Sequence, residues 1–247
     1  MSDAAPSIAI SHWADRENPT KRRLLDALRE WAEVTLFDPR TEHPDLAERG
    51  FDLYHMAGWY PEALRDLRRA DRTSVRTINP YYGARATADR LACGQIRRRG
   101  GVRAPEFQYG RAAEITLEPP VIVKPRWELQ EGGHEFAIVR SGAPSFDGER
   151  LVEEFVAPRR SYKIHRVGEA VRAVKEVETT REVETTARIR GLTDRIVELF
   201  GLSLFEMDVV VHKNWYVIDV NPVVSLHGVE DGAVIYERLI RSRLSES

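Results

Sequence analysis

Hydrophobic positions along this chain recur with the period of an α-helix in some segments and form short apolar runs in others. Leu24, Leu25, Leu28 and Trp31 fall on one face of a helix if residues 20–31 are helical. The same spacing, with proline at helix starts and glycine at helix ends, predicts further helices. They cover residues 61–70, 86–99, 187–199 and 232–244.

Short apolar runs that are rich in β-branched residues predict strands between these helices. They cover residues 7–11, 34–37, 51–55, 75–78, 120–124, 135–139, 151–156, 161–167 and 170–174. In the first eighty residues strands alternate with helices, which favours a parallel sheet with helices on its faces. We therefore expect an α/β protein whose N-terminal lobe covers residues 1–82.

A hairpin near the end of the sequence carries the most informative polar residues. Residues 204–211 and 216–220 are rich in valine, and a short polar turn joins them. Side chains alternate between the faces of a strand, so Asp219 and Asn221 point the same way and Asp208 can face them from the neighbouring strand. Carboxylate and amide oxygens suit Mg²⁺. These residues could instead serve turns, but the apolar neighbours of Asp219 favour a metal, because a buried carboxylate needs a partner.

Composition narrows the function classes. The chain has 247 residues, of which 42% are apolar and 31% charged, with a formal net charge of −2 and a single cysteine. No apolar run approaches the length of a membrane span, and we expect no secretory signal. One cysteine fits a reducing compartment, and the near-neutral charge gives no argument for nucleic acid. We expect a cytoplasmic protein that acts on a small molecule, with no nucleic-acid or membrane partner.

A second set of polar residues lies before the hairpin. Lys124 ends an apolar strand, and the loop that follows contains Gly132 and Gly133. Such a loop lets backbone N–H groups approach phosphates, although a glycine pair between strands is also an ordinary turn. Lys163 and His165 alternate along a later strand and therefore share one face, where Lys163 could also be a solvated edge lysine.

These features together resemble the ATP-grasp fold and, within it, the inositol trisphosphate 5/6-kinase family. The resemblance covers residues 79–229 and rests on phrases that follow the family's motifs in order. They are the pair Asp89–Arg90, Lys124 at its strand end, HEFAIV from His134, EEFV from Glu153 to Val156, Lys163 before VGE, Asp208, and IDVN with Asp219 and Asn221.

The resemblance implies that ATP binds between a central lobe of residues 83–150 and a C-terminal lobe of residues 151–247. It implies phosphate contacts from Arg90, Lys124 and Lys163, and Mg²⁺ ligands at Asp208, Asp219 and Asn221. Adenine is expected along Glu153, Glu154, Phe155 and Val156, with the Glu153 carbonyl and the Val156 N–H as main-chain partners. His134 and Lys163 are the expected catalytic residues.

Two functions stay open on this basis. The family likeness favours a kinase that transfers the γ-phosphoryl group of ATP to a hydroxyl of a polar, anionic small molecule such as an inositol phosphate. The alternative is a carboxylate–amine ligase, which activates a carboxylate as an acyl phosphate and uses the same ATP site. An inactive nucleotide-binding module is a third possibility, against which the complete metal set argues.

The acceptor is expected between the His134 loop and the segment from Arg159 to His165, with Ser225 nearby, because arginine forks suit anionic groups. Two departures from the family bear on its identity. The sequence PVVS at 222–225 replaces the family's Phe-Pro-Gly, and an acidic EVETT repeat at 176–180 and 182–186 replaces a serine-bearing segment.

Overall fold

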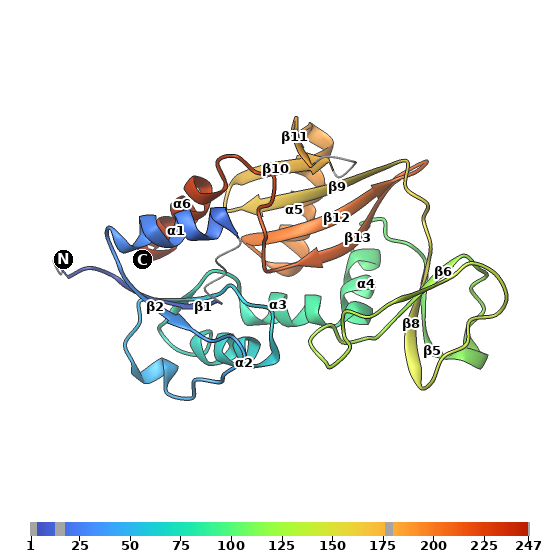
Figure 1. Cartoon of the computed structure of the whole chain (residues 1–247), viewed down its shortest axis with the longest axis horizontal. Helices are drawn as coiled ribbons and strands as arrows, with labels where there is room; N and C mark the ends of the chain where they lie inside the picture. The colour runs from blue at the N-terminus through green and yellow to red at the C-terminus, as the bar shows by residue number, and fades with distance from the viewer. Residues whose placement is uncertain (1–3, 13–17, 176–179, 247) are drawn as a thin grey trace.

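The structure is a computed structural model that describes residues 4–12, 18–175 and 180–246. Residues 176–179 of the first EVETT phrase lie outside this description. The described residues form three β-sheets with helices packed against them, and the first and last helices lie side by side (Figure 1). None of the described helices is long and apolar enough to cross a bilayer.

The N-terminal lobe is the parallel sheet that the alternating pattern predicted. Its strand order is β2-β1-β3-β4, and the pairs β1–β2, β1–β3 and β3–β4 are all parallel. The strands are β1 (Ser7–Ser11), β2 (Glu33–Phe37), β3 (Leu53–Met56) and β4 (Arg76–Thr77), and the helices are α1 (Pro19–Arg29), the short η1 (Leu46–Glu48), α2 (Pro61–Ala70) and α3 (Tyr81–Ala88). Alternate residues of β1 enter different cores, since Ile8 and Ile10 pack with α1 and Ala9 packs with α2 and α3.

The C-terminal helix α6 (Gly232–Ser245) packs on this lobe rather than standing apart in the last one. Tyr236 and Ile240 share one apolar cluster with Ile8 and Leu28. The expected lobe boundary at residue 82 falls inside α3 and stays a prediction, and residues of α6 complete the first core.

The single helix expected over residues 86–99 is wrong, because the chain breaks at Asp89. Helix α3 ends at Ala88 and α4 (Arg90–Arg99) begins directly after Asp89, whose backbone is extended, with φ −99° and ψ 98°. Its carboxylate accepts hydrogen bonds from the N–H groups of Leu91 (3.1 Å) and Ala92 (3.3 Å). A carboxylate that caps a new helix competes with continuing the old one, and the hydrophobic period cannot reveal this.

The central lobe is a small antiparallel sheet with the order β5-β8-β6-β7. Its elements are β5 (Phe107–Arg111), the short η2 (Ala112–Glu114), β6 (Val121–Lys124), β7 (Ala137–Val139) and β8 (Glu149–Glu154). Strand β5 was not predicted, and β8 lies two residues earlier than the predicted strand 151–156. Its buried core contains only Val121, Val123 and Val152 among the described residues, so this lobe is thin.

The third sheet has the order β11-β10-β9-β12-β13 and is antiparallel throughout. Its strands are β9 (Arg160–Val167), β10 (Ala170–Lys175), β11 (Arg181–Val183), β12 (Leu204–Val211) and β13 (Trp215–Asn221), and α5 (Ala187–Phe200) covers its apolar face. The predicted hairpin is confirmed, and its turn is closed by the His212 N–H, which donates to Asn214 O at 3.0 Å. The short β11 was read as a polar connection and was missed.

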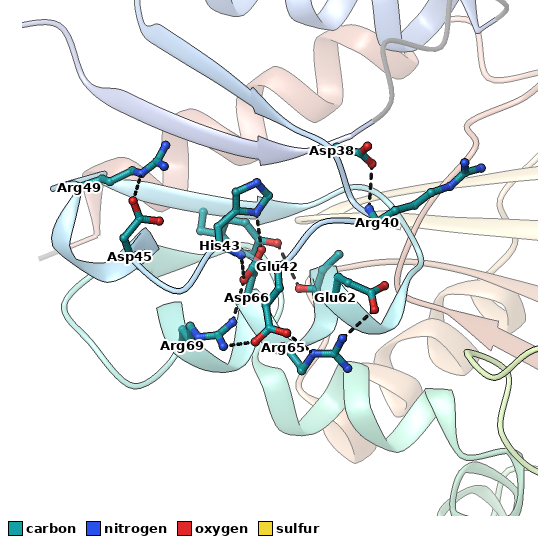
Figure 2. A network of polar contacts seen from close by, with 12 residues as sticks. Asp38, Arg40, Glu42, His43, Asp45, Arg49, Glu62, Arg65, Asp66 and Arg69 are labelled. Atoms are coloured by element: carbon teal, nitrogen blue, oxygen red, sulfur yellow. Dashed lines mark hydrogen bonds and ion pairs between the residues drawn. The ribbon is translucent and has the colours of Figure 1, made fainter.

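A network of charged side chains ties the loop after β2 to α2 (Figure 2). The carboxylate of Asp66 is buried and accepts hydrogen bonds from the His43 N–H (2.9 Å), from Arg69 Nη1 (3.0 Å) and, at 2.8 Å, from His43 Nδ1 when that nitrogen is protonated. The His43 ring stacks on Phe37 with a centroid distance of 4.1 Å. Asp66 therefore fixes a loop that is also anchored by the buried side chain of Leu46.

Replacing Asp66 by alanine is expected to lower the free energy of unfolding by about 2 kcal/mol, because the partly buried Arg69 guanidinium and the His43 N–H lose the acceptor that they share. Urea denaturation measures this loss. Asp45→Ala is the matched control, since Asp45 pairs with Arg49 on the exposed surface of the same loop and should leave stability close to wild type. Equal, small effects of both substitutions would contradict the role of Asp66.

Candidate functional site

Three neighbouring strands bring Lys163 and two of the three predicted metal ligands, Asp208 and Asp219, into one row. Lys163 on β9 lies opposite Asp208 on β12, and Asp208 lies opposite Asp219 on β13. The next row on the same face contains His165, Glu206 and Asn221. Residues opposite one another on antiparallel strands share a face, so the sheet has one apolar side, under α5, and one side with a charged strip.

The charges in the strip neutralise one another in part. Lys163 Nζ donates to Asp208 Oδ1 at 2.7 Å and lies 3.5 Å from Glu206 Oε1. Burial raises the pKa of the Asp208 carboxyl above its usual value, although Lys163 acts in the opposite direction. Lys163 therefore offsets part of the negative charge that Glu206, Asp208 and Asp219 place on one face of the sheet.

The central lobe supplies a facing pair of charges. Lys124 at the end of β6 forms an ion pair with Glu153 on the neighbouring strand β8, and both side chains are largely buried. The ammonium group of Lys124 has three N–H donors. Its ion pair with Glu153 uses only part of them, so Lys124 can donate further hydrogen bonds to a ligand.

A cavity of about 250 Å³ lies between the two sheets, with α4 as its third wall. Its lining includes Lys124 and Glu153 from one sheet, and Asp208, Ile218 and Asp219 from the other. Arg90, Cys93 and Arg97 come from α4, and His134, Glu135 and Phe136 come from the loop before β7. Cations and carboxylates thus converge on one partly closed space with an apolar floor.

Arg90 holds the glycine loop in place. Its Nη1 donates to Pro125 O at 3.0 Å and to Gly133 O at 2.7 Å. A Cβ atom at Gly133 would lie 2.0 Å from Glu128 O, so this position excludes any side chain. Arg90 therefore lines the cavity while part of its hydrogen bonding is committed to the loop.

Glu128 is a buried carboxylate next to the cavity, and no sequence pattern pointed to it. It lies 3.9 Å from Arg90 Nη2 and 3.8 Å from His134 Nδ1. Burial, followed by the negative charge of Asp219, raises the pKa of Glu128 to about 7, and Arg90 acts against this rise.

The predicted acceptor residues do not all line the cavity. His134 does, whereas Arg159, His165 and Ser225 do not. Arg159 is exposed just before β9, where its N–H donates to Val211 O at 2.8 Å. An acceptor site between His134 and the segment from Arg159 to His165 stays a prediction, because the alternation of a strand gives the face of a residue but not which end of the sheet meets the other lobe.

His165 and Ser225 belong to a separate polar cluster. His165 is fully buried, which lowers its pKa to about 4 and keeps the ring neutral near pH 7. Its Nδ1 lies 3.6 Å from Glu206 Oε2, and the same oxygen accepts from Ser225 N (2.7 Å) and Ser225 Oγ (3.0 Å). Asn18 Nδ2 in turn donates to Ser225 O at 3.1 Å. This cluster links the strip to the cap of α1.

The expected adenine strand is partly displaced. Strand β8 lies between β5 and β6, so both of its edges are paired at Glu153, and the Glu153 side chain serves Lys124. The strand ends at Glu154, and the Phe155 N–H donates to Pro120 O at 2.9 Å. Val156 lies beyond the paired part of β8. Adenine contacts by Glu153, Glu154, Phe155 and Val156 stay a prediction.

Sequence reasoning missed Glu206, Glu128 and Arg126. Glu206 stands two residues before Asp208 on one strand, so the alternation of side chains was a signal that could have placed it on the same face. Arg126 binds both carboxylate oxygens of Asp89, at 2.9 and 2.7 Å, and no local pattern predicted this pair.

The donor set was tested for a metal ion. Within the described ranges, no cluster of three or more His, Cys, Asp and Glu side chains is arranged to hold one. The strip instead offers two facing carboxylates, Asp208 and Asp219, with Asn221 one row further along. Asn221 Oδ1 already accepts from the Val223 N–H at 2.8 Å, which leaves its second lone pair. Two carboxylates and an amide, beside space for further oxygens, fit Mg²⁺, which keeps several waters.

Comparison with solved structures was made on the fold as a whole. An ATP-grasp RimK domain protein from Sphaerobacter thermophilus is similar with a TM-score of 0.77 and 21% identity, covering 94% of this chain and 98% of that one. PurK, the N5-carboxyaminoimidazole ribonucleotide synthetase, was solved as its ADP complex and is similar with a TM-score of 0.75 and 12% identity, covering 99% of this chain and 78% of that one. D-alanine–D-alanine ligase from Bacillus anthracis is similar with a TM-score of 0.71 and 15% identity, covering 98% of this chain and 96% of that one.

The chain has the ATP-grasp fold, as its motifs predicted. No family model matches the sequence, and a search of curated proteins found no match either. None of the three structures carries the name of a kinase, and the likeness to inositol trisphosphate 5/6-kinases stays a prediction.

The raised pKa of Glu128 makes stability depend on pH in a defined direction. The unfolded carboxyl ionises above its ordinary pKa of 4.5, whereas the folded one keeps its proton until about 7. This contribution to stability is fully present below pH 4.5 and is lost as the pH rises to about 7. Glu128→Gln removes the loss, so the variant should gain about 3 kcal/mol over wild type between pH 4.5 and pH 8.

Urea denaturation of both proteins at several pH values measures this difference. The matched control is Glu131→Gln, an exposed glutamate in the same loop, which should follow the wild-type curve. Parallel pH dependence of wild type and Glu128→Gln would show that Glu128 is not held protonated by the fold.

Proposed function

We propose that this protein is an ATP- and Mg²⁺-dependent carboxylate–amine ligase that works through an acyl phosphate. The observation that carries the proposal is the cavity between the two sheets, where Lys124 from one lobe faces Asp208 and Asp219 from the other. A polyphosphate needs cations on one side and metal-binding carboxylates on the other, and transfer of its terminal phosphoryl group is achieved mostly by positioning and charge stabilisation.

We assign roles to residues that line the cavity or lie beside it from their contacts. Lys124 binds phosphate oxygens with the donors that Glu153 leaves, and Arg90 fixes the glycine loop over the phosphates. Lys163 balances Asp208 before the nucleotide enters and is the second candidate for a phosphate contact. Asp208, Asp219 and Asn221 would hold Mg²⁺, which would neutralise part of the negative charge of the nucleotide phosphates.

The names of the structural neighbours support a ligase more than a kinase. Two of the three are a ligase and a synthetase, and none refers to inositol phosphate. Arg159 and His165 do not line the cavity, so the lining itself offers less of the arginine-rich wall that an anionic polyol would use. His134 is exposed and lines the cavity, and we assign it to contact with the acceptor in either reaction.

Lys124 is expected to contribute to ATP affinity, but its removal alone would leave Glu153 buried without a partner. The comparison is therefore made in a Glu153→Gln background, where Lys124→Gln should weaken ATP binding by about 1.5–3 kcal/mol, the range for hydrogen bonds to charged groups. Calorimetry with ATP and Mg²⁺ measures it. Lys213→Gln, an exposed lysine in the turn after β12, is the control. Unchanged affinity in the double variant would remove Lys124 from the nucleotide site.

The reaction itself is tested by incubating the protein with ATP, Mg²⁺ and pooled amino acids, short peptides and polyols, followed by mass spectrometry. A ligase forms a condensation product that has lost water relative to its two substrates, together with ADP and phosphate. Phosphorylated polyol without condensation would instead support the kinase.

Asp219→Asn should lower turnover at least a hundredfold at unchanged stability, since the metal loses a carboxylate. Full activity in that variant would refute the metal assignment.

A further inference from the structure

A groove outside the cavity described above combines arginines with an apolar floor. It has a volume of about 240 Å³ and lies between α2, α3 and the segment that includes Trp127 and Leu129. Leu64 and Ala88 form buried parts of its floor. Three arginines line it, Arg65, Arg68 and Arg85, and no aspartate or glutamate does.

Two of these arginines have no acidic partner in the described part of the chain. Arg65 is paired with Glu42 and Glu62, whereas Arg68 and Arg85 form no ion pair or side-chain hydrogen bond with any described residue. They lie over aromatic rings instead, with Arg85 Cζ at 4.2 Å from the Trp127 centroid and Arg68 Cζ at 5.9 Å from that of Tyr81. Stacking holds a guanidinium by its face and leaves its N–H donors, which lie in the guanidinium plane, for a carboxylate.

We propose that this groove binds an acidic peptide segment in which a carboxylate side chain stands next to a large apolar side chain. Charge complementarity selects the anion, because the groove contributes cations that the protein itself does not neutralise. The volume selects the form of the occupant. At about 240 Å³ the groove is smaller than the roughly 300–1,000 Å³ of sites that enclose whole small molecules, and it has room for one side chain of a longer segment.

The groove shares a wall with the nucleotide cavity. Trp127 and Leu129 face the groove, while Glu128 between them is buried beside Arg90 and His134. The Glu128 N–H donates to Ala88 O at 3.0 Å, which joins this segment to the end of α3. A peptide that holds Trp127 therefore also holds the segment whose next residues carry the glycine pair, and its binding is coupled to that of the nucleotide.

Calorimetry with three blocked tripeptides tests the groove on the full-length protein. The probes are acetyl-Glu-Phe-Glu-amide, the matching Lys-Phe-Lys peptide and the matching Glu-Gly-Glu peptide. The first should bind, more weakly as salt is raised, and the other two should bind at least tenfold more weakly. Equal binding of the acidic and basic peptides would overturn the proposal.

Variants locate the binding. The affinity for the acidic peptide should fall roughly tenfold in Arg68→Ala and in Arg85→Ala. The variant Arg85→Lys keeps the charge but loses the planar fork, so its affinity should lie between those of wild type and Arg85→Ala. Arg72→Ala is the control, since Arg72 is an exposed arginine just after α2 and outside the groove. Peptide binding that survives the loss of both groove arginines would refute the site.

Coupling is measured with a non-hydrolysable ATP analogue and Mg²⁺. The peptide should change the affinity of the analogue, and the analogue should change that of the peptide by the same factor. Independent binding of the two would overturn the coupling. If the analogue fails to bind while the peptide still requires Arg68 and Arg85, the nucleotide function is wrong and the groove stands.

Discussion

The antiparallel pairing of β9, β12 and β13 is the constraint on which the rest of the site depends. It sets Lys163, Asp208 and Asp219 side by side at fixed strand spacing, on a sheet whose other face is apolar and covered by α5. A slip of one residue would turn the carboxylates into that core and expose valines in their place. The strand register that buries the apolar face also forms the charged strip on the other face. A change of register would therefore disrupt the core and the site together.

The central lobe depends on contacts outside its own sheet. Its buried core is small, and the bonds from Arg90 to Pro125 and Gly133, with the Arg126–Asp89 pair, tie it to α4. A helix cap and two arginines thus orient one wall of the cavity relative to the other. The pair Asp89–Arg90 therefore has a structural role in this chain, in addition to the functional role that was predicted for it.

Alternation and periodicity predicted a large share of this structure, for reasons that also set their limits. They placed α2 at its observed bounds and put Asp208 opposite Asp219, because strand and helix periods are local properties of the chain. They failed at Asp89, where one side chain ends a helix and caps the next. They could not show that Arg159, His165 and Ser225 lie outside the lining of the cavity, because the distance between two lobes depends on tertiary contacts that no local pattern encodes.

The packing of the last helix on the first lobe has a consequence for how the molecule holds together. Tyr236 of α6 meets His55 of β3 in the interior, and Ile240 joins the cluster around Ile8 and Leu28. A fragment that ends at residue 82 would keep α1 on this face of the sheet but would lose the side chains of α6 that complete the cluster. The first lobe therefore takes part of its core from a segment that is distant in the sequence, and we expect α6 to stabilise it.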